Sequence, residues 1–152
     1  MVSLPPVGLL SSLQSAIATR LRESDLISQV PAIDVLEEDK GDLDAGIAKA
    51  VGHLGIVVSI ETPALRPGDE GQPVQEAAVI ISVQENVPIN RGPAGSQRTW
   101  LSVAEHVIAM LVGWPPAGGW SPIEFGGLER IGPGTPVEAQ VSFTTSAIIR
   151  AA

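Results

Sequence analysis

The segment from Gly92 to Thr99, GPAGSQRT, comes nearest to a recognised chemical motif. A phosphate-binding loop has a glycine, four further residues, and then glycine, lysine and serine or threonine, placed between a strand and a helix. Gly92 and Thr99 fit this pattern, but Gln97 replaces the second glycine and Arg98 replaces the lysine. A side chain at position 97 would hinder the backbone from wrapping a phosphate. The segment therefore favours an ordinary loop before a helix, with a nucleotide- or small-ligand-binding loop at 92–99 as the alternative.

A second candidate is the acidic run Asp42–Gly46, DLDAG, which is similar to the start of a calcium-binding loop. That loop requires a glutamate at its twelfth position, where this sequence has His53. Carboxylates are also favourable at the N-terminus of a helix. We therefore expect a solvated acidic turn that begins a short helix, rather than a calcium site.

The remaining catalytic residue types are sparse. The chain has two histidines, His53 and His106, and no cysteine. Thiolate chemistry and cysteine-ligated zinc are therefore excluded, and two isolated histidines do not fill a metal shell. The sequence also lacks the His-Glu-x-x-His and Gly-x-Ser-x-Gly patterns. We predict a protein that is not an enzyme and that uses no metal or cofactor.

The sequence predicts three helices, two of which begin at the ends of the segments 92–99 and 42–46. Leucine and isoleucine recur at helical spacing over residues 7–23, which predicts the first long helix. A second long helix begins after Thr99, a residue suited to capping, and stops at Gly113. A shorter helix is predicted over 45–51, directly behind the acidic run.

Alternating apolar residues predict four strands, over 55–62, 76–85, 123–131 and 137–149. The first two are expected to pair as an antiparallel hairpin, because a loop rich in proline and glycine at 63–75 joins them.

The order of these elements predicts the fold class. The segment 26–35 is short, apolar and interrupted by Pro31, so an edge strand and an extended linker both remain open. Strands that come in adjacent pairs favour hairpins over parallel crossovers. We predict an α+β fold in a single domain, 1–152. It would have an approximately four-stranded, mainly antiparallel sheet with two long amphipathic helices packed on one face.

The overall charge limits the classes of partner that the protein is expected to bind. The net charge is −8, the pI is about 4.6, and aromatic residues make up 3% of the chain. Proteins that bind phosphate backbones or anionic membranes carry a basic face, and single-strand binders use aromatic stacking. The N-terminal residues lack a basic stretch followed by a long apolar one, so we expect no signal peptide. The sequence predicts a protein made in the cytoplasm, with neither a membrane nor a nucleic acid as its binding partner.

One stretch of the sequence resembles a known family. The segment Val83–Arg91, VQENVPINR, is followed by a glycine-rich turn and an amphipathic helix that ends in Met110–Trp114, MLVGW. Together with the predicted hairpin and final strands, this resembles the tail terminator and tail-completion proteins of long-tailed phages and prophages. The resemblance covers most of the chain in layout and is sharpest over 83–114.

The resemblance implies a structural role in a virion tail or tail-like particle, made in the host bacterial cytoplasm. The family forms a ring of the same chain, typically six copies, that caps the tail tube and ends its polymerisation. Its implied partners are the tail tube protein and the head connector protein, with DNA only as passing cargo. A head–tail joining or other tail-completion role remains an alternative.

A closed ring needs two different patches on each subunit. We expect the loops 63–75 and 86–98 to supply them, and Trp114 and Trp120 either to join that contact or to cover one end of the core. The candidate interface residues are Arg66, Asp69, Glu70, Asn86, Asn90, Arg91, Arg98, Trp114 and Trp120. Five acidic residues are expected to face the channel and repel DNA, namely Glu37, Glu38, Asp39, Asp42 and Asp44.

Overall fold

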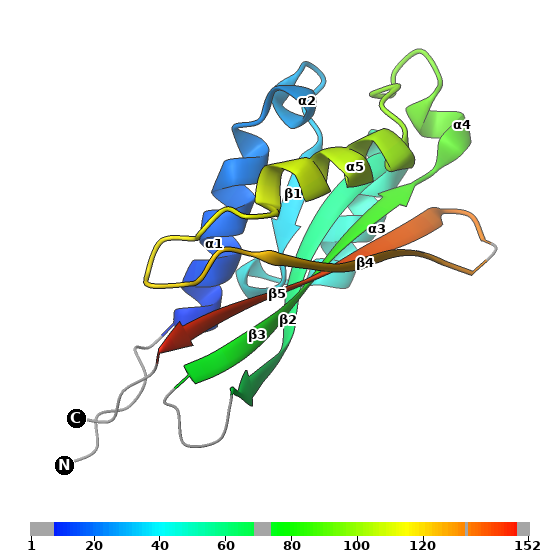
Figure 1. The fold of residues 1–152 in the computed structure, drawn as a ribbon. Coiled ribbons are helices and arrows are strands. Elements are labelled where there is room, and N and C mark those ends of the chain that lie inside the picture. The colour runs from blue at the N-terminus through cyan, green and yellow to red at the C-terminus, as the bar shows by residue number, and fades with distance from the viewer. Residues whose placement is uncertain (1–7, 69–73, 133, 149–152) are drawn as a thin grey trace.

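Five strands form the centre of the fold in the computed structural model, which describes residues 8–68, 74–132 and 134–148 (Figure 1). The strand order is β1-β2-β3-β5-β4, with β1 parallel to β2 and the other pairs antiparallel. The α+β class is thus confirmed, but the sheet is mixed and has one strand more than predicted. The strands are β1 (Asp34–Glu37), β2 (Ile56–Pro67), β3 (Val74–Glu85), β4 (Glu124–Ile131) and β5 (Val137–Ile148).

The helices surround this sheet. The two long ones are α1 (Leu9–Arg22) and α5 (Trp100–Leu111), and α3 (Leu43–His53) is the third. Shorter turns complete the set, namely α2 (Asp25–Ser28), the 3-10 turn η1 (Glu38–Lys40) and α4 (Val87–Asn90).

The additional strand, β1, explains why the sheet is mixed. It lies at the end of the segment 26–35, for which an edge strand or a linker had remained open, and it pairs with residues 57–60 of β2. Parallel neighbours need a crossover connection, and α3 supplies it between β1 and β2. Four residues with an acid at each end, Asp34 and Glu37, are too short a pattern to predict a strand from the sequence.

The predicted loop at 63–75 is largely strand. β2 continues to Pro67 and β3 already begins at Val74, so the hairpin is longer than predicted. A register shift between Glu61 and Ala64 breaks the alternation on which the prediction relied. Pro63 is tolerated in β2 because β1 pairs with β2 only as far as Ile60.

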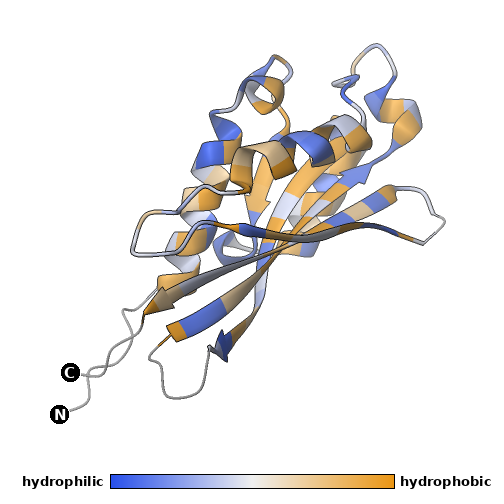
Figure 2. Cartoon of the chain, viewed as in Figure 1, coloured by the Kyte–Doolittle hydropathy of each residue, from blue (hydrophilic) through white to orange (hydrophobic). Residues whose placement is uncertain are grey.

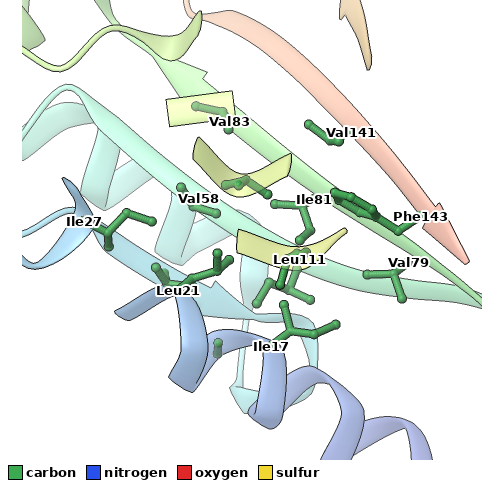
Figure 3. Packing of buried hydrophobic residues seen from close by; sticks show 14 of the residues in the cluster. Ile17, Leu21, Ile27, Val58, Val79, Ile81, Val83, Leu111, Val141 and Phe143 are labelled. Carbon is green, nitrogen blue, oxygen red and sulfur yellow. The ribbon is translucent and has the colours of Figure 1, made fainter. Parts of the chain in front are cut away.

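The main core lies between the sheet and the two long helices. Ile17 and Leu21 of α1 and Leu111 of α5 pack against Ile81 of β3 and Phe143 of β5 (Figure 3). Figure 2 shows the same amphipathic division, with apolar residues along the strands and on part of each helix. The alternation in the strands and the spacing in the helices therefore produce one shared apolar layer.

The opposite face of the sheet is covered by α3 at one side only. Ala50 and Val51 of α3 pack on Val57 of β2 in a second, smaller cluster. Gly46 allows the close approach, because a Cβ there would lie 3.1 Å from a methyl carbon of Leu36. The prediction placed no helix on this face, and α3 lies there because it forms the crossover between two parallel strands.

Candidate functional site

The family-like segment converges on one buried carboxylate, that of Glu85 at the end of β3. Its Oε1 accepts hydrogen bonds from the backbone N–H of Trp100 at 3.1 Å and from Nη2 of Arg91 at 3.2 Å. Its Oε2 accepts from Nδ2 of Asn90 at 2.6 Å and from Nε of Arg91 at 3.1 Å. The Glu85 side chain is fully buried, whereas that of Arg91 is 47% exposed. Every donor that surrounds this carboxylate comes from the 90–100 segment, so Glu85 organises that segment.

Asn90 joins the two ends of the same loop. Its Nδ2 also donates to the backbone oxygen of Arg98 at 2.9 Å, and its Oδ1 accepts from the backbone N–H and the hydroxyl of Ser96. Two glycines make room for it. A Cβ on Gly55 would lie 2.3 Å from the Asn90 nitrogen, and one on Gly95 would lie 2.1 Å from the Asn90 carbonyl oxygen. Glu85, Asn90, Arg91, Ser96 and Arg98 are referred to below as the Glu85 network.

Arg98 extends the network to the N-terminal third of the chain. Its guanidinium donates to the backbone oxygens of Leu26, Gln29 and Pro31, in and after α2. Burial lowers the pKa of Arg98, because desolvation penalises its charge. The arginine therefore braces the α2–β1 connection.

These contacts argue against phosphate binding at 92–99. Two of the amides at the start of α5 are already engaged, since Glu85 accepts from Trp100 and the Thr99 hydroxyl accepts from the Ser102 N–H at 3.2 Å. Arg98 faces α2, and Gln97 takes up a positive φ of 63° with a side chain where the motif has glycine. A carboxylate of the chain itself occupies the place that an anion would take at this helix end.

The pKa of Glu85 reports the balance of forces in the network. Burial alone would raise the pKa, but hydrogen bonds from Arg91, Asn90 and Trp100 outweigh it and hold the pKa below its usual value. A carboxylate that is ionised and fully hydrogen-bonded is suited to positioning a loop. Proton transfer, by contrast, needs a group whose pKa lies near the working pH.

The predicted acidic set makes mostly internal contacts. Glu37 is buried and pairs with Arg22 at 3.2 Å, and Glu38 accepts from the Thr62 N–H at 3.3 Å. Asp39 accepts from the Ser11 hydroxyl, and Asp42 caps α3 by accepting from the Ala45 N–H at 3.1 Å. Glu37 therefore joins β1 to α1, Glu38 and Asp39 join η1 to β2 and α1, and Asp42 caps α3. Asp44 is exposed in the first turn of α3.

Another carboxylate group was missed by the sequence reasoning. Glu61 of β2 has a raised pKa because of its partial burial and the nearby charges of Glu38, Asp44 and Glu138. The four come from β2, η1, α3 and β5, so only the sheet topology brings them together.

The structure distributes the other candidate interface residues unevenly. Asn90, Arg98 and Trp120 are buried within this chain, and Asn86 caps α4 by accepting from the Ile89 N–H at 3.4 Å. For Trp120 this agrees with the alternative of covering the core.

The remaining candidate interface residues are Trp114, Arg66, Asp69 and Glu70. Trp114 is partly buried, with the Arg20 guanidinium 4.7 Å above its ring. Arg66 is exposed on β2. Asp69 and Glu70 lie outside the described residues.

Within the described residues, no group of three or more histidine, aspartate or glutamate side chains could hold a metal ion. In the same part of the chain, no helix is long and apolar enough to cross a membrane.

Comparisons with known proteins give a likeness of fold. No protein-family model matches the chain, and no curated protein matches its sequence. Among solved structures, a chain from the virion of a native gene transfer agent particle matches with a TM-score of 0.59 at 17% sequence identity. The match covers 93% of this chain and 96% of that one. The two chains therefore share a fold over nearly their whole lengths.

Proposed function

We propose that this protein is a structural subunit of a phage tail or tail-like particle, in which a ring of copies caps the tail tube. In this role it ends tube polymerisation and presents a surface to the head connector protein. The observation that carries the proposal is the fold match to a chain from a gene transfer agent virion, which covers nearly all of both chains. A head–tail joining role is the alternative that needs the same fold and the same partners.

Two features of this chain support a role in assembly. The segment with the family resemblance, 83–114, is the one that the Glu85 network makes rigid. Glu85 and Asn90 are hydrogen-bonded within the network, and Arg98 bonds to the α2–β1 connection, so the geometry is suited to holding a shape for a partner.

The test is to remove the gene from cells that produce the parent particle and to image the tails by electron microscopy. A terminator that is missing leaves tube growth unchecked, so we expect tubes of excessive and uneven length. Restoring the intact gene should return tails to one length. A missing head–tail joining subunit would instead leave tails of normal length detached from filled heads. Normal, complete particles would contradict the proposal.

A further inference from the structure

Five apolar side chains form an exposed surface at one side of the molecule. Leu101 of α5 and Val112, the residue after α5, are 44% and 47% exposed, and Phe125 and Leu128 of β4 are 48% and 37% exposed. Ile108 lies between the first two on α5 and is half-buried. We call these five residues the α5–β4 shelf. Contiguous apolar surface of this kind marks interaction sites on soluble proteins.

The shelf exists because two helices cover four strands and leave the fifth bare. Phe125 and Leu128 are the register partners of Phe143 and Val141, so they lie on the face of the sheet that carries α1 and α5. No residue of β4 is buried. β4 is the outermost strand, beyond β5, and α5 packs on β3 and β5.

The α5 side chains of the shelf point toward this bare strand. Met110 lies beside α1, and His106 lies near Asp25 of α2. At 100° per residue, Leu101, Ile108 and Val112 lie on the opposite flank of α5, away from α1. Hydrogen bonds between residues 113–114 and Ile123 hold the end of α5 beside the start of β4. The helix flank and the strand face therefore belong to one surface.

The edge of β4 is less suited to pairing than its face. A bulge between Phe125 and Gly127 interrupts the register, and β4 carries the charged residues Glu124, Glu129 and Arg130. Bulges and charges are the features that keep natural edge strands from adding further strands. A partner would therefore dock on the side chains of the shelf rather than extend the sheet.

A second exposed apolar site lies on a different element of the same chain. The ends of β2 and β3, residues 64–67 and 74–77, extend beyond the helices (Figure 1) and are referred to as the arm. The arm presents Leu65, which is 38% exposed, next to the exposed Arg66. Two unlike patches on one chain are what a head-to-tail ring requires, whereas a two-fold dimer uses one patch twice.

Charge also favours this pairing of surfaces. Copies with a net charge of −8 repel one another, so a contact between them must bring opposite charges together. Arg20, Arg22, Arg91 and Arg98 make contacts within their own chain. Arg66 of the arm makes no ion pair among the described residues, nor does Arg130 of β4, and Glu105 lies beside Leu101 and Ile108 on the shelf flank of α5.

We propose that the α5–β4 shelf receives a second copy of this chain, and that the arm of that copy, led by Leu65 and Arg66, is the element that docks. This inference rests on the proposed ring, and it names the two surfaces that would close it. The docked arm would cover Leu128 and Phe125 and place Arg66 near Glu105.

The absence of cysteine from the chain allows a direct test by disulfide cross-linking. One sample carries Leu65→Cys and the other carries Leu128→Cys, and the two are mixed at equal concentration under mild oxidation. We expect a cross-linked dimer that contains one copy of each variant, at a yield at least about tenfold above collision controls, because docking raises the effective thiol concentration. The matched control mixes Leu65→Cys with Val30→Cys, since Val30 is 95% exposed and lies on another element.

Each result bears on one of the two proposals. Cross-linking no better than the Val30 control, in a protein that native mass spectrometry shows as a closed oligomer, would overturn the arm–shelf contact and leave the ring intact. Self-linking of Leu128→Cys alone at high yield would mean that two shelves meet around a two-fold axis, which also overturns it. A protein that is monomeric at every concentration and does not cross-link would overturn both. As a second variant, Leu128→Glu adds a charge at an exposed position, and it should abolish the oligomer while leaving a folded monomer with an unchanged circular dichroism spectrum.

Discussion

At the scale of single residues, the most informative group is Glu85. A buried carboxylate is costly unless each lone pair finds a donor. Here Asn90, Arg91 and the amide of Trp100 supply those donors. Asn90 also donates to the backbone oxygen of Arg98, which fixes the two ends of the 90–98 loop together. The segment 92–99, which the sequence suggested as a phosphate-binding loop, is thus positioned by the carboxylate of Glu85.

We predict that Glu85→Gln destabilises the protein by about 2 kcal/mol, because the amide NH2 cannot accept the hydrogen bonds that the carboxylate accepts. The midpoint of urea unfolding measures the change. Glu129→Gln on the exposed strand β4 is the matched control and should leave the midpoint within error. Equal midpoints for the two variants would show that the Glu85 network adds nothing to stability.

Gly95 should not tolerate a methyl group. A Cβ at this position would lie 2.1 Å from the carbonyl oxygen of Asn90, so backbone atoms would have to move. We expect Gly95→Ala to cost about 3 kcal/mol or more. Gly52→Ala in α3 meets nothing within 4 Å and should stabilise the protein by up to about 1 kcal/mol through helix propensity. Thermal unfolding of the two variants compares them, and similar melting temperatures would contradict the close packing around Asn90.

His106 makes stability depend on pH. Burial lowers its pKa from 6.5, with partial opposition from Asp25, and its buried Nε2 has no hydrogen-bond partner among the described residues. Because the unfolded chain then binds more protons than the folded one, stability falls as pH drops below about 6.5. We expect His106→Gln to lose less stability than the natural protein between pH 7 and pH 5. Parallel denaturation curves across that range would exclude this role.

At the scale of elements, the α2–β1 connection depends on Arg98. Three backbone oxygens of residues 26–31 accept hydrogen bonds from its guanidinium. We predict that Arg98→Lys loosens this connection, because one ammonium group cannot span three separate acceptors. Hydrogen–deuterium exchange should become faster at residues 26–33 while the amides of β3 and β5 stay protected. Unchanged exchange at 26–33 would mean that Ile27 and its neighbours hold the connection without Arg98.

Periodicity explains which elements the sequence predicts. α1, α5 and β5 repeat their apolar residues at the expected spacing, and the structure has them close to the predicted ranges. β1 is too short for a pattern, and the bulge after Glu61 conceals the second half of β2. Because β1 was the strand left open, the parallel pair and the place of α3 could not be predicted.

The candidate site was harder to predict than the elements. The segment 83–91 drew attention as a motif, but whether Glu85 is buried depends on donors that lie up to 15 residues away. The acidic run is solvated at Glu38, Asp39, Asp42 and Asp44, but Glu37 is buried. Four of its members also meet partners that only the folded chain brings near, namely Arg22, Ser11, Thr62 and the cap of α3. An acidic stretch is visible in a sequence, but the hydrogen-bond donors that its side chains contact are set by the fold.

At the scale of the whole molecule, the uneven cover of the sheet connects structure with function. The long helices leave β4 bare, and the arm extends beyond them (Figure 1). A monomer gains nothing from an exposed shelf and an exposed arm, whereas the proposed ring would bury both. The shared fold with a chain from a gene transfer agent virion supports this account over nearly the full length of the protein.

The central claim is that the protein assembles with itself, and native mass spectrometry over a range of concentrations tests it most directly. The account predicts one closed oligomer of about six copies that is indifferent to added ATP, because a ring has a fixed number of heterologous interfaces. A monomer that gains one nucleotide would contradict it and would return the 92–99 loop to the centre of the function.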